Sequence, residues 1–172
     1  MNTAIAPSGN TTTPQTDDRA GKYLVFELAG EEFGIRVLAV REIIGIQDIT
    51  PVPHTPHYVK GVINLRGKVI PVIDIRLKFS LPAAEYTQRT CIIVVQVTGH
   101  TGSILMGIVV DGVAEVLTLA GSEIEDTPKF ADGTQIPYIF GMAKVKNRVK
   151  ILLDINQVLN NQELFTLSSL DR

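Results

Sequence analysis

The sequence predicts an all-β protein built from two similar, small β barrels packed against each other. From Lys22 onward, short runs rich in β-branched residues alternate with turn signals that contain Gly or Asn. Several of these runs are apolar on both faces, so each strand needs a cover on both sides, which two packed barrels would supply. An internal duplication of the β segments predicts that the two barrels resemble each other.

The composition fits a folded protein of this kind. The chain has 172 residues, of which 45% are apolar and 20% charged, and a chain near this length buries roughly 70% of its unfolded surface. The net charge of −2 argues against a protein that binds nucleic acid or an anionic membrane through a basic face. One cysteine, Cys91, excludes an internal disulfide. Because no apolar run reaches the roughly 20 residues of a membrane span, we expect a cytoplasmic protein.

Residues 1–20 are rich in Thr, Pro, Asn, Ser and Gly and lack large apolar groups, which predicts a disordered tail. Pro71 interrupts an apolar run and has no N–H for a ladder, so we expect its strand at a sheet edge or a bulge. The clearest strands are predicted at Tyr23–Leu28, Lys68–Ile73, Cys91–Val97, Ile104–Val110 and Arg148–Leu153. Turns are predicted at 29–30, 66–67, 99–102, 132–133 and 146–147.

Two helices are predicted to accompany the strands. A short helix covers Val37–Ile43, and a C-terminal helix covers residues 155–165. The second follows Asp154, whose side chain can accept hydrogen bonds from the free N–H groups of a first helical turn.

Two blocks of the sequence recur farther along the chain. Residues 61–75 align without gaps with residues 141–155 at an offset of 80 positions. Residues 33–44 align with residues 106–117 at an offset of 73 positions. We interpret the repeats as a tandem duplication that produces two β subdomains with a pseudo-twofold relation. The alternative is that short β hairpins resemble one another by chance.

Residue types that could carry catalysis or hold a metal are scattered. His54 and His57 share a Pro-rich segment with no third ligand nearby, and Cys91 opens an apolar strand with no histidine placed to activate it. Asp111 before Gly112 is typical of a turn or bulge. We therefore predict no catalytic residue, no metal site and no cofactor. A β scaffold with edge strands and exposed apolar surface is typical of a binding module.

Four stretches of the sequence resemble one known family, the CheW family of chemotaxis coupling proteins. They are residues 23–44, 61–76, 107–117 and 150–154, and the Asn64-Leu65-Arg66-Gly67 turn is the most specific of their features. The resemblance spans about residues 20–160. It implies a domain over residues 21–165 with two five-stranded SH3-like or OB-like barrels that exchange a strand and share a core. The first barrel would lie mainly at 33–86 and the second mainly at 90–145.

The resemblance also implies a function. CheW-like proteins are non-enzymatic adaptors that couple the cytoplasmic tips of chemoreceptors to the histidine kinase CheA, at receptor arrays beneath the inner membrane. One barrel would dock on the kinase regulatory domain, and the helical-hairpin tip of the receptor would lie in the apolar groove between the two barrels. Nucleic-acid binding and membrane insertion are not implied. The alternative from a different class is an OB-like barrel that binds nucleic acid or a small ligand.

Carried over residue by residue, the resemblance implies a partner-binding site. Its members are Val40, Glu42, Gly61, Asn64, Leu65, Arg66, Gly67, Val113 and Val116. Ordinary roles stay open beside this one, because the valines would also suit a core, Glu42 a solvated surface and Gly61 a backbone requirement.

Arg66 would ordinarily be an exposed charge in a hairpin turn, but its planar guanidinium suits a carboxylate or carbonyl partner. The second repeat carries Lys146-Asn147 where the first has Arg66-Gly67. We therefore expect the functional turn to be the first one.

Overall fold

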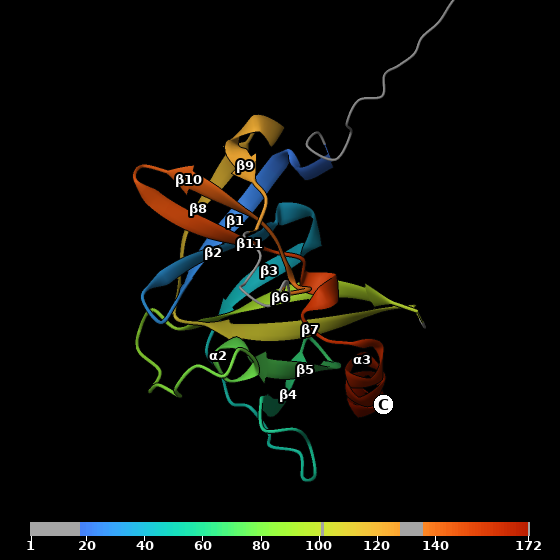
Figure 1. Cartoon of the computed structure of the whole chain (residues 1–172). Helices are drawn as coiled ribbons and strands as arrows, with labels where there is room; N and C mark the ends of the chain where they lie inside the picture. Colours follow the sequence, from blue (N-terminus) through green and yellow to red (C-terminus); the bar gives the residue numbers. More distant parts are fainter. Residues whose placement is uncertain (1–17, 101, 128–135, 172) are drawn as a thin grey trace, which may run out of the picture.

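Two β sheets, one of six strands and one of five, contain most of the described chain (Figure 1). The computed structural model describes residues 18–100, 102–127 and 136–171. Across the six-stranded sheet lie, in order, β8 (Gly112–Leu119), β1 (Gly21–Leu28), β2 (Glu31–Arg36), β11 (Arg148–Leu153), β10 (Ile139–Val145) and β9 (Ile124–Glu125). Across the five-stranded sheet lie β3 (Val40–Gly45), β6 (Cys91–Gly99), β7 (Gly102–Val110), β5 (Lys68–Asp74) and β4 (Val59–Leu65). The prediction of an all-β fold is confirmed.

The strands predicted from β-branched runs are all present, as β1, β5, β6, β7 and β11. Three of the predicted turns take the left-handed backbone that tight hairpin turns require. The φ angles are 51° and 82° at Ala29-Gly30, 52° and 87° at Arg66-Gly67, and 54° and 65° at Lys146-Asn147. The turn predicted at 132–133 lies outside the described residues.

The two sheets exchange hairpins, so each contains strands from both repeats. β1 and β2 pair with β8 and β11, whereas β6 and β7 pair with β3 and β5. The two parallel pairings have the same register, because Gly34 opposes Leu152 in one and Gly107 opposes Val72 in the other. These pairs are related by the sequence offsets of 73 and 80 positions, so the topology repeats as the sequence does.

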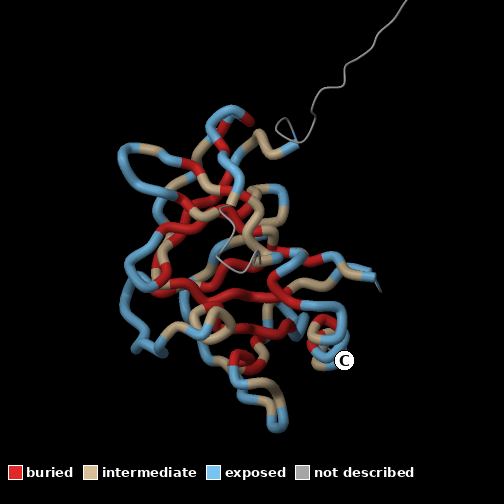
Figure 2. The backbone as a smooth tube through the Cα atoms, in the orientation of Figure 1, coloured by how far each residue is buried: buried red, intermediate tan, exposed pale blue. Residues whose placement is uncertain are grey.

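A shared core lies between the sheets, and a smaller core lies within each. Both faces of β6 are apolar because each face packs into a different core. Ile93, Val95 and Val97 pack into the shared core, whereas Ile92 and Val94 point into the core of the five-stranded sheet. In Figure 2 the buried residues run through the middle of the molecule, where the two sheets meet.

The helix predicted at Val37–Ile43 is wrong beyond its first residues. A single 3-10 turn, η1 (Val37–Ala39), is followed at once by strand β3. The reason is tertiary pairing, since β3 forms an antiparallel ladder with β6 in which Ile43 opposes Ile93. β-branched residues favour this extended conformation over a helix.

The C-terminal helix exists, but it is not continuous over 155–165. η3 (Ile155–Gln157) comes first, with the Asp154 carboxylate accepting from the Asn156 N–H at 3.0 Å as predicted. The α-helix α3 (Asn161–Ser168) has its own capping box, formed by Asn160 and Glu163. The remaining short elements are α2 (Ile75–Lys78), η2 (Gly121–Glu123) and η4 (Ser169–Asp171).

Pro71 does not lie in an edge strand, because β5 is between β7 and β4, and the register shift between β4 and β5 lies at Val59/Gly61 rather than opposite Pro71. Its neighbour across the ladder is Val62. The N–H and C=O groups of Val62 are hydrogen-bonded to Thr50, both at 2.9 Å. Val62 therefore has no carbonyl left that needs an N–H from Pro71. Pairing with β7 begins only at Val72. The missing N–H of proline is therefore tolerated inside the sheet.

Arg19 belongs to the fold, although residues 1–20 were predicted as a disordered tail. Its guanidinium donates to the Asp126 carboxylate at 3.0 Å and to the carbonyl of Ile124 at 3.4 Å. The Tyr23 hydroxyl donates to the Arg19 carbonyl at 2.6 Å. The ordered part of the chain therefore begins before Gly21, while residues 1–17 lie outside the described residues.

Candidate partner-binding site

An ion pair joins strand β3 to the turn between β4 and β5. Arg66, in that turn, donates through Nη1 to Glu42 Oε1 at 3.2 Å and through Nη2 to Glu42 Oε2. The Asn64 side chain accepts from the Gly67 N–H at 2.8 Å and so fixes the turn. The expectation that the planar guanidinium would meet a carboxylate holds, but the carboxylate belongs to the same chain.

Both partners of this pair stay at the surface, with 72% of the Arg66 side chain and 29% of the Glu42 side chain exposed. The hydrogen bond from Arg66 holds the pKa of Glu42 below its usual value, so the pair is ionised at neutral pH. Exposed ion pairs contribute little to stability because water and salt screen them. The pair therefore adds little stability, but it constrains the direction of the Arg66 guanidinium.

A groove of about 510 Å³ runs beside the ion pair. Its apolar lining comes from Leu65, Ile104 and Leu105, and the basic side chains of Arg41 and Lys68 line it as well. An apolar surface bordered by cations is suited to an apolar segment of a partner that carries carboxylates.

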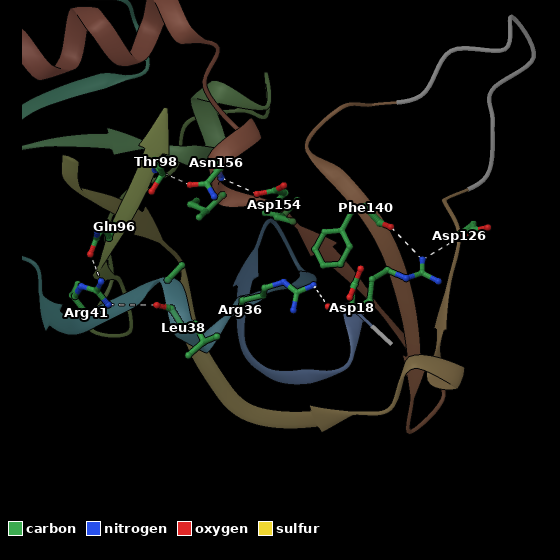
Figure 3. A pocket seen from close by; sticks show the side chains of 14 residues that line it. Asp18, Arg36, Leu38, Arg41, Gln96, Thr98, Asp126, Phe140, Asp154 and Asn156 are labelled. Atoms are coloured by element: carbon green, nitrogen blue, oxygen red, sulfur yellow. Dashed lines mark hydrogen bonds and ion pairs between the residues drawn. The ribbon is translucent and has the colours of Figure 1, made fainter. Parts of the chain in front are cut away.

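A larger groove, of about 700 Å³, lies between the two sheets (Figure 3). Phe140 and Leu153 line it from the six-stranded sheet, and Gln96 lines it from the five-stranded sheet. At its border Leu38 of η1 is 87% exposed. Arg41 and Gln96 line both grooves and are hydrogen-bonded to each other, so the two grooves are neighbours across this pair.

Four other predicted site residues do not line the groove beside the ion pair. Val40 and Val113 are half-buried and pack against the shared core. Gly61 has a φ of 141°, and a Cβ there would lie 2.0 Å from the carbonyl oxygen of Thr50, so its role is a backbone requirement. Val116 is 54% exposed on β8, in the other sheet. Neither Val113 nor Val116 lines the groove beside the ion pair.

The sequence prediction missed Leu38, Arg41, Lys68 and Gln96. Leu38 and Arg41 fell inside the segment predicted as a helix, where exposure of a leucine could not be foreseen. A signal was present in the repeat alignment, which places Leu38 opposite Asp111. An apolar residue in one copy and an acid in the other is typical of a position that has diverged in role.

Two exchanged β sheets with two neighbouring grooves, the larger lined by both Arg and Asp side chains, define a β-barrel binding module. Within residues 18–100, 102–127 and 136–171, no helix has the length and apolar character needed to cross a membrane. In the same part of the chain no three His, Cys, Asp or Glu side chains gather into a metal site.

The chain belongs to the CheW-like family, because the family model described as "CheW-like domain" matches residues 22–163. It is 39% identical over 143 residues to the chemotaxis protein CheW of Klebsiella aerogenes, an alignment that covers 83% of this chain and 84% of that protein. It is 38% identical to the chemotaxis protein CheW of Bacillus subtilis, with 82% of this chain and 88% of that protein covered.

The fold is also similar to a solved structure. The crystal structure of the scaffolding protein TtCheW from Thermoanaerobacter tengcongensis superposes with a TM-score of 0.72 at 32% sequence identity. The superposition covers 81% of this chain and 92% of that one.

Proposed function

We propose that this chain is a non-catalytic adaptor that couples chemoreceptor cytoplasmic tips to a CheA-type histidine kinase in an array beneath the inner membrane. The observation that carries the proposal is the Glu42–Arg66 pair on the turn that most resembles the CheW family, beside two neighbouring grooves. The groove beside the pair presents Leu65, Ile104 and Leu105 to an apolar helical surface. Relatives named chemotaxis protein CheW, whose alignments cover most of both chains, support this role.

In this role the groove between the sheets accepts the helical tip of the receptor, and one sheet docks on the kinase regulatory domain. Glu42 has its carboxylate committed to Arg66, so its task is to orient that guanidinium rather than to meet a basic group of the partner. Val40 and Val113 contribute to the shared core, and Val116 is exposed on β8 outside both grooves.

Co-sedimentation tests the adaptor role directly. Receptor tip fragments, a CheA-type kinase and this chain are mixed, and the sedimented kinase and its autophosphorylation rate are measured with and without the chain. We expect kinase to sediment with receptor only when the chain is present. Single-stranded DNA and RNA serve as the other arm. Binding of nucleic acid without any kinase in the pellet would favour an OB-like nucleic-acid barrel instead.

Substitution of Arg66 by Ala tests the site, and the duplicated turn supplies a matched control. Lys146 occupies the corresponding turn with a φ of 54°, against 52° at Arg66, so alanine is equally strained at both positions. We expect Arg66→Ala to weaken the coupled complex about tenfold or more. Lys146→Ala should leave coupling unchanged while lowering the melting temperature to a similar extent.

Equal losses of coupling in the two variants would contradict this assignment, because they would place the effect in the turn backbone rather than in the guanidinium.

A further inference from the structure

A buried ion pair lies in the six-stranded sheet, where β2 of the first repeat meets β11 of the second (Figure 1). Lys150 of β11 donates to the carboxylate of Glu32, which is its partner in the parallel pairing of the two strands. Only 4% of the Lys150 side chain and 9% of the Glu32 side chain are exposed. Among the described residues, no other ion pair has both side chains below 10% exposure. Two charges are therefore held out of water where the two repeats join.

The surroundings keep both groups charged. The hydrogen bond from Lys150 holds the pKa of Glu32 below its usual value. Arg148 lies beside the pair, with Nη1 3.7 Å from Glu32 Oε2, and its Nη2 donates to the Gly30 carbonyl at 3.1 Å. A buried ion pair adds little net stability, because the loss of hydration offsets the attraction, but separating its partners is strongly unfavourable. Such a pair is suited to discriminating between arrangements that keep it and arrangements that separate it.

The corresponding place in the five-stranded sheet is apolar. The offsets of 73 and 80 positions relate Glu32 to Leu105 of β7 and Lys150 to Ile70 of β5. Ile70 is completely buried in the core of that sheet, and Leu105 packs against the same core. One copy of the duplicated fold therefore places two ions where the other places two hydrocarbon side chains.

The neighbours of Lys150 and Ile70 within their hairpins differ in size. Ala143 of β10 lies opposite Lys150 and is completely buried. Its counterpart, Ile63 of β4, lies opposite Ile70 and is 2% exposed. The small alanine leaves room for the long lysine side chain, whereas the isoleucine fills the equivalent space. The difference between the copies therefore belongs to the packing of each hairpin as a unit.

Hairpins that arise by duplication can join in two ways. In the observed exchange, β2 pairs with β11 and β7 pairs with β5. Without exchange, each repeat would close on itself, with β2 beside β5 and β7 beside β11. In the same register, Glu32 would then lie beside Ile70, and Lys150 beside Leu105. Each charged side chain would be buried without a partner of opposite charge, which is costly.

We propose that the Glu32–Lys150 pair selects the exchanged arrangement of the two repeats, because only this arrangement buries the two charges together. The pair thus gives a duplicated chain a reason to fold into two interleaved sheets rather than two self-contained barrels. This role concerns the assembly of the fold and is independent of the proposed function.

Replacement of the pair by the residues of the other sheet tests the proposal. The double variant Glu32→Leu with Lys150→Ile has apolar side chains at all the positions concerned, so both arrangements bury equivalent groups. Apolar replacement of a buried ion pair is often neutral or stabilising, so this variant should fold. The isotope-labelled full chain is unfolded in urea and refolded, and nuclear Overhauser effects between backbone protons then identify the strand beside β2.

The unsubstituted chain should show contacts of Gly34 with Leu152 and a single set of amide signals, as its pairing requires. The double variant should show a second set of signals, from about 10% of the molecules or more, in which Gly34 contacts Val72. A double variant that refolds with one set of signals and only the contact to Leu152 would overturn the inference.

Two further variants separate charge pairing from the loss of charge as such. Glu27→Leu with Arg89→Ile is the control, because it removes an ion pair in which 62% of the Arg89 side chain is exposed and which does not join β2 to β11. Glu32→Lys with Lys150→Glu reverses the buried pair. Both variants should keep one arrangement, since in each of them only the exchange buries opposite charges together. A second arrangement in the control or in the reversed variant would contradict selection by charge pairing. The apolar double variant decides the question whatever the stability of the reversed one.

Discussion

Two glycines, Gly34 and Gly107, occupy corresponding places in the two parallel pairings. A Cβ on Gly107 would lie 2.6 Å from Cγ2 of Ile92, a stiff β-branched side chain in the core of the five-stranded sheet. A Cβ on Gly34 would lie 3.1 Å from Cδ2 of Leu152, the far end of a flexible side chain. The two copies therefore differ in how much space they leave at the same position.

We expect Gly107→Ala to lower the free energy of unfolding by about 1–3 kcal/mol, the usual cost of overpacking a core. Gly34→Ala should cost less, since Leu152 can move and alanine restricts the unfolded chain. Urea denaturation of both variants measures the difference. A larger loss at Gly34 than at Gly107 would contradict the packing argument.

Asp111 is the other residue whose role is set by its surroundings. Burial alone would raise the pKa of Asp111, but the hydrogen bonds from Arg76 and from the Ala29 N–H outweigh burial and bring the pKa below its ordinary value. A carboxyl with a lowered folded-state pKa stabilises the fold above its unfolded pKa, about 4. That contribution disappears as the pH falls through the folded-state value.

Asp111→Asn should therefore lower the free energy of unfolding by about 1–2 kcal/mol at pH 7, since one-third of the side chain is exposed and partly screened. The gap to the unsubstituted chain should narrow as the pH drops below about 4. Asp126→Asn is the control, because Asp126 also pairs with an arginine but is 90% exposed. A gap that stays constant down to pH 2.5 would count against an ionised Asp111 in the fold.

Among the elements, residues 18–20 show how a short segment before β1 is tied to the fold by side-chain contacts. Only 16% of the Arg19 side chain is exposed. It reaches β9 and β10 through Ile124 and Phe140. The segment thus connects the start of β1 to the opposite edge of the six-stranded sheet.

Two truncated chains test whether residues 18–20 contribute to stability. A chain beginning at Asp18 should have the same melting temperature as the full chain. One beginning at Gly21 should have a free energy of unfolding lower by about 1–3 kcal/mol, the scale of charged hydrogen bonds lost from a partly buried site. Differential scanning calorimetry of the two truncations gives the comparison. Identical melting of both would show that Arg19 contributes nothing to stability.

At the scale of the whole molecule, the exchange of hairpins makes the two sheets interdependent. β1, with Leu24 and Phe26, and β6, with Ile93 and Val95, contribute to the same shared core although they belong to different sheets. Neither sheet can lose its strands without exposing that core. The protein should therefore behave as one cooperative unit.

Thermal unfolding should show a single transition whose calorimetric and van't Hoff enthalpies agree. Ile92→Ala removes a buried side chain from the core of the five-stranded sheet alone. The substitution should lower the free energy of unfolding by about 2–5 kcal/mol. The single transition should move to a lower temperature rather than split in two. Two separated transitions in either protein would show that the sheets unfold independently.

The local features could be predicted from the amino-acid sequence alone. β-branched runs marked β1, β5, β6, β7 and β11, turn residues marked hairpins with positive φ, and Asp154 marked a cap. The turn that pairs with Glu42 could be singled out by resemblance to the CheW family. These features are encoded by neighbours in the chain, through side-chain alternation and turn chemistry, so they can be read without knowing the fold.

Three features could be seen only in the folded chain: which hairpin joins which sheet, that Glu42 pairs with Arg66 24 positions away, and that Leu38 is exposed while Asp111 is hydrogen-bonded. Pairing with β6 made β3 a strand where the sequence prediction placed a helix. The physical reason is common to all these cases. Ladder pairing, ion pairing and burial join residues distant in sequence, and their energies depend on the packing of both repeats together.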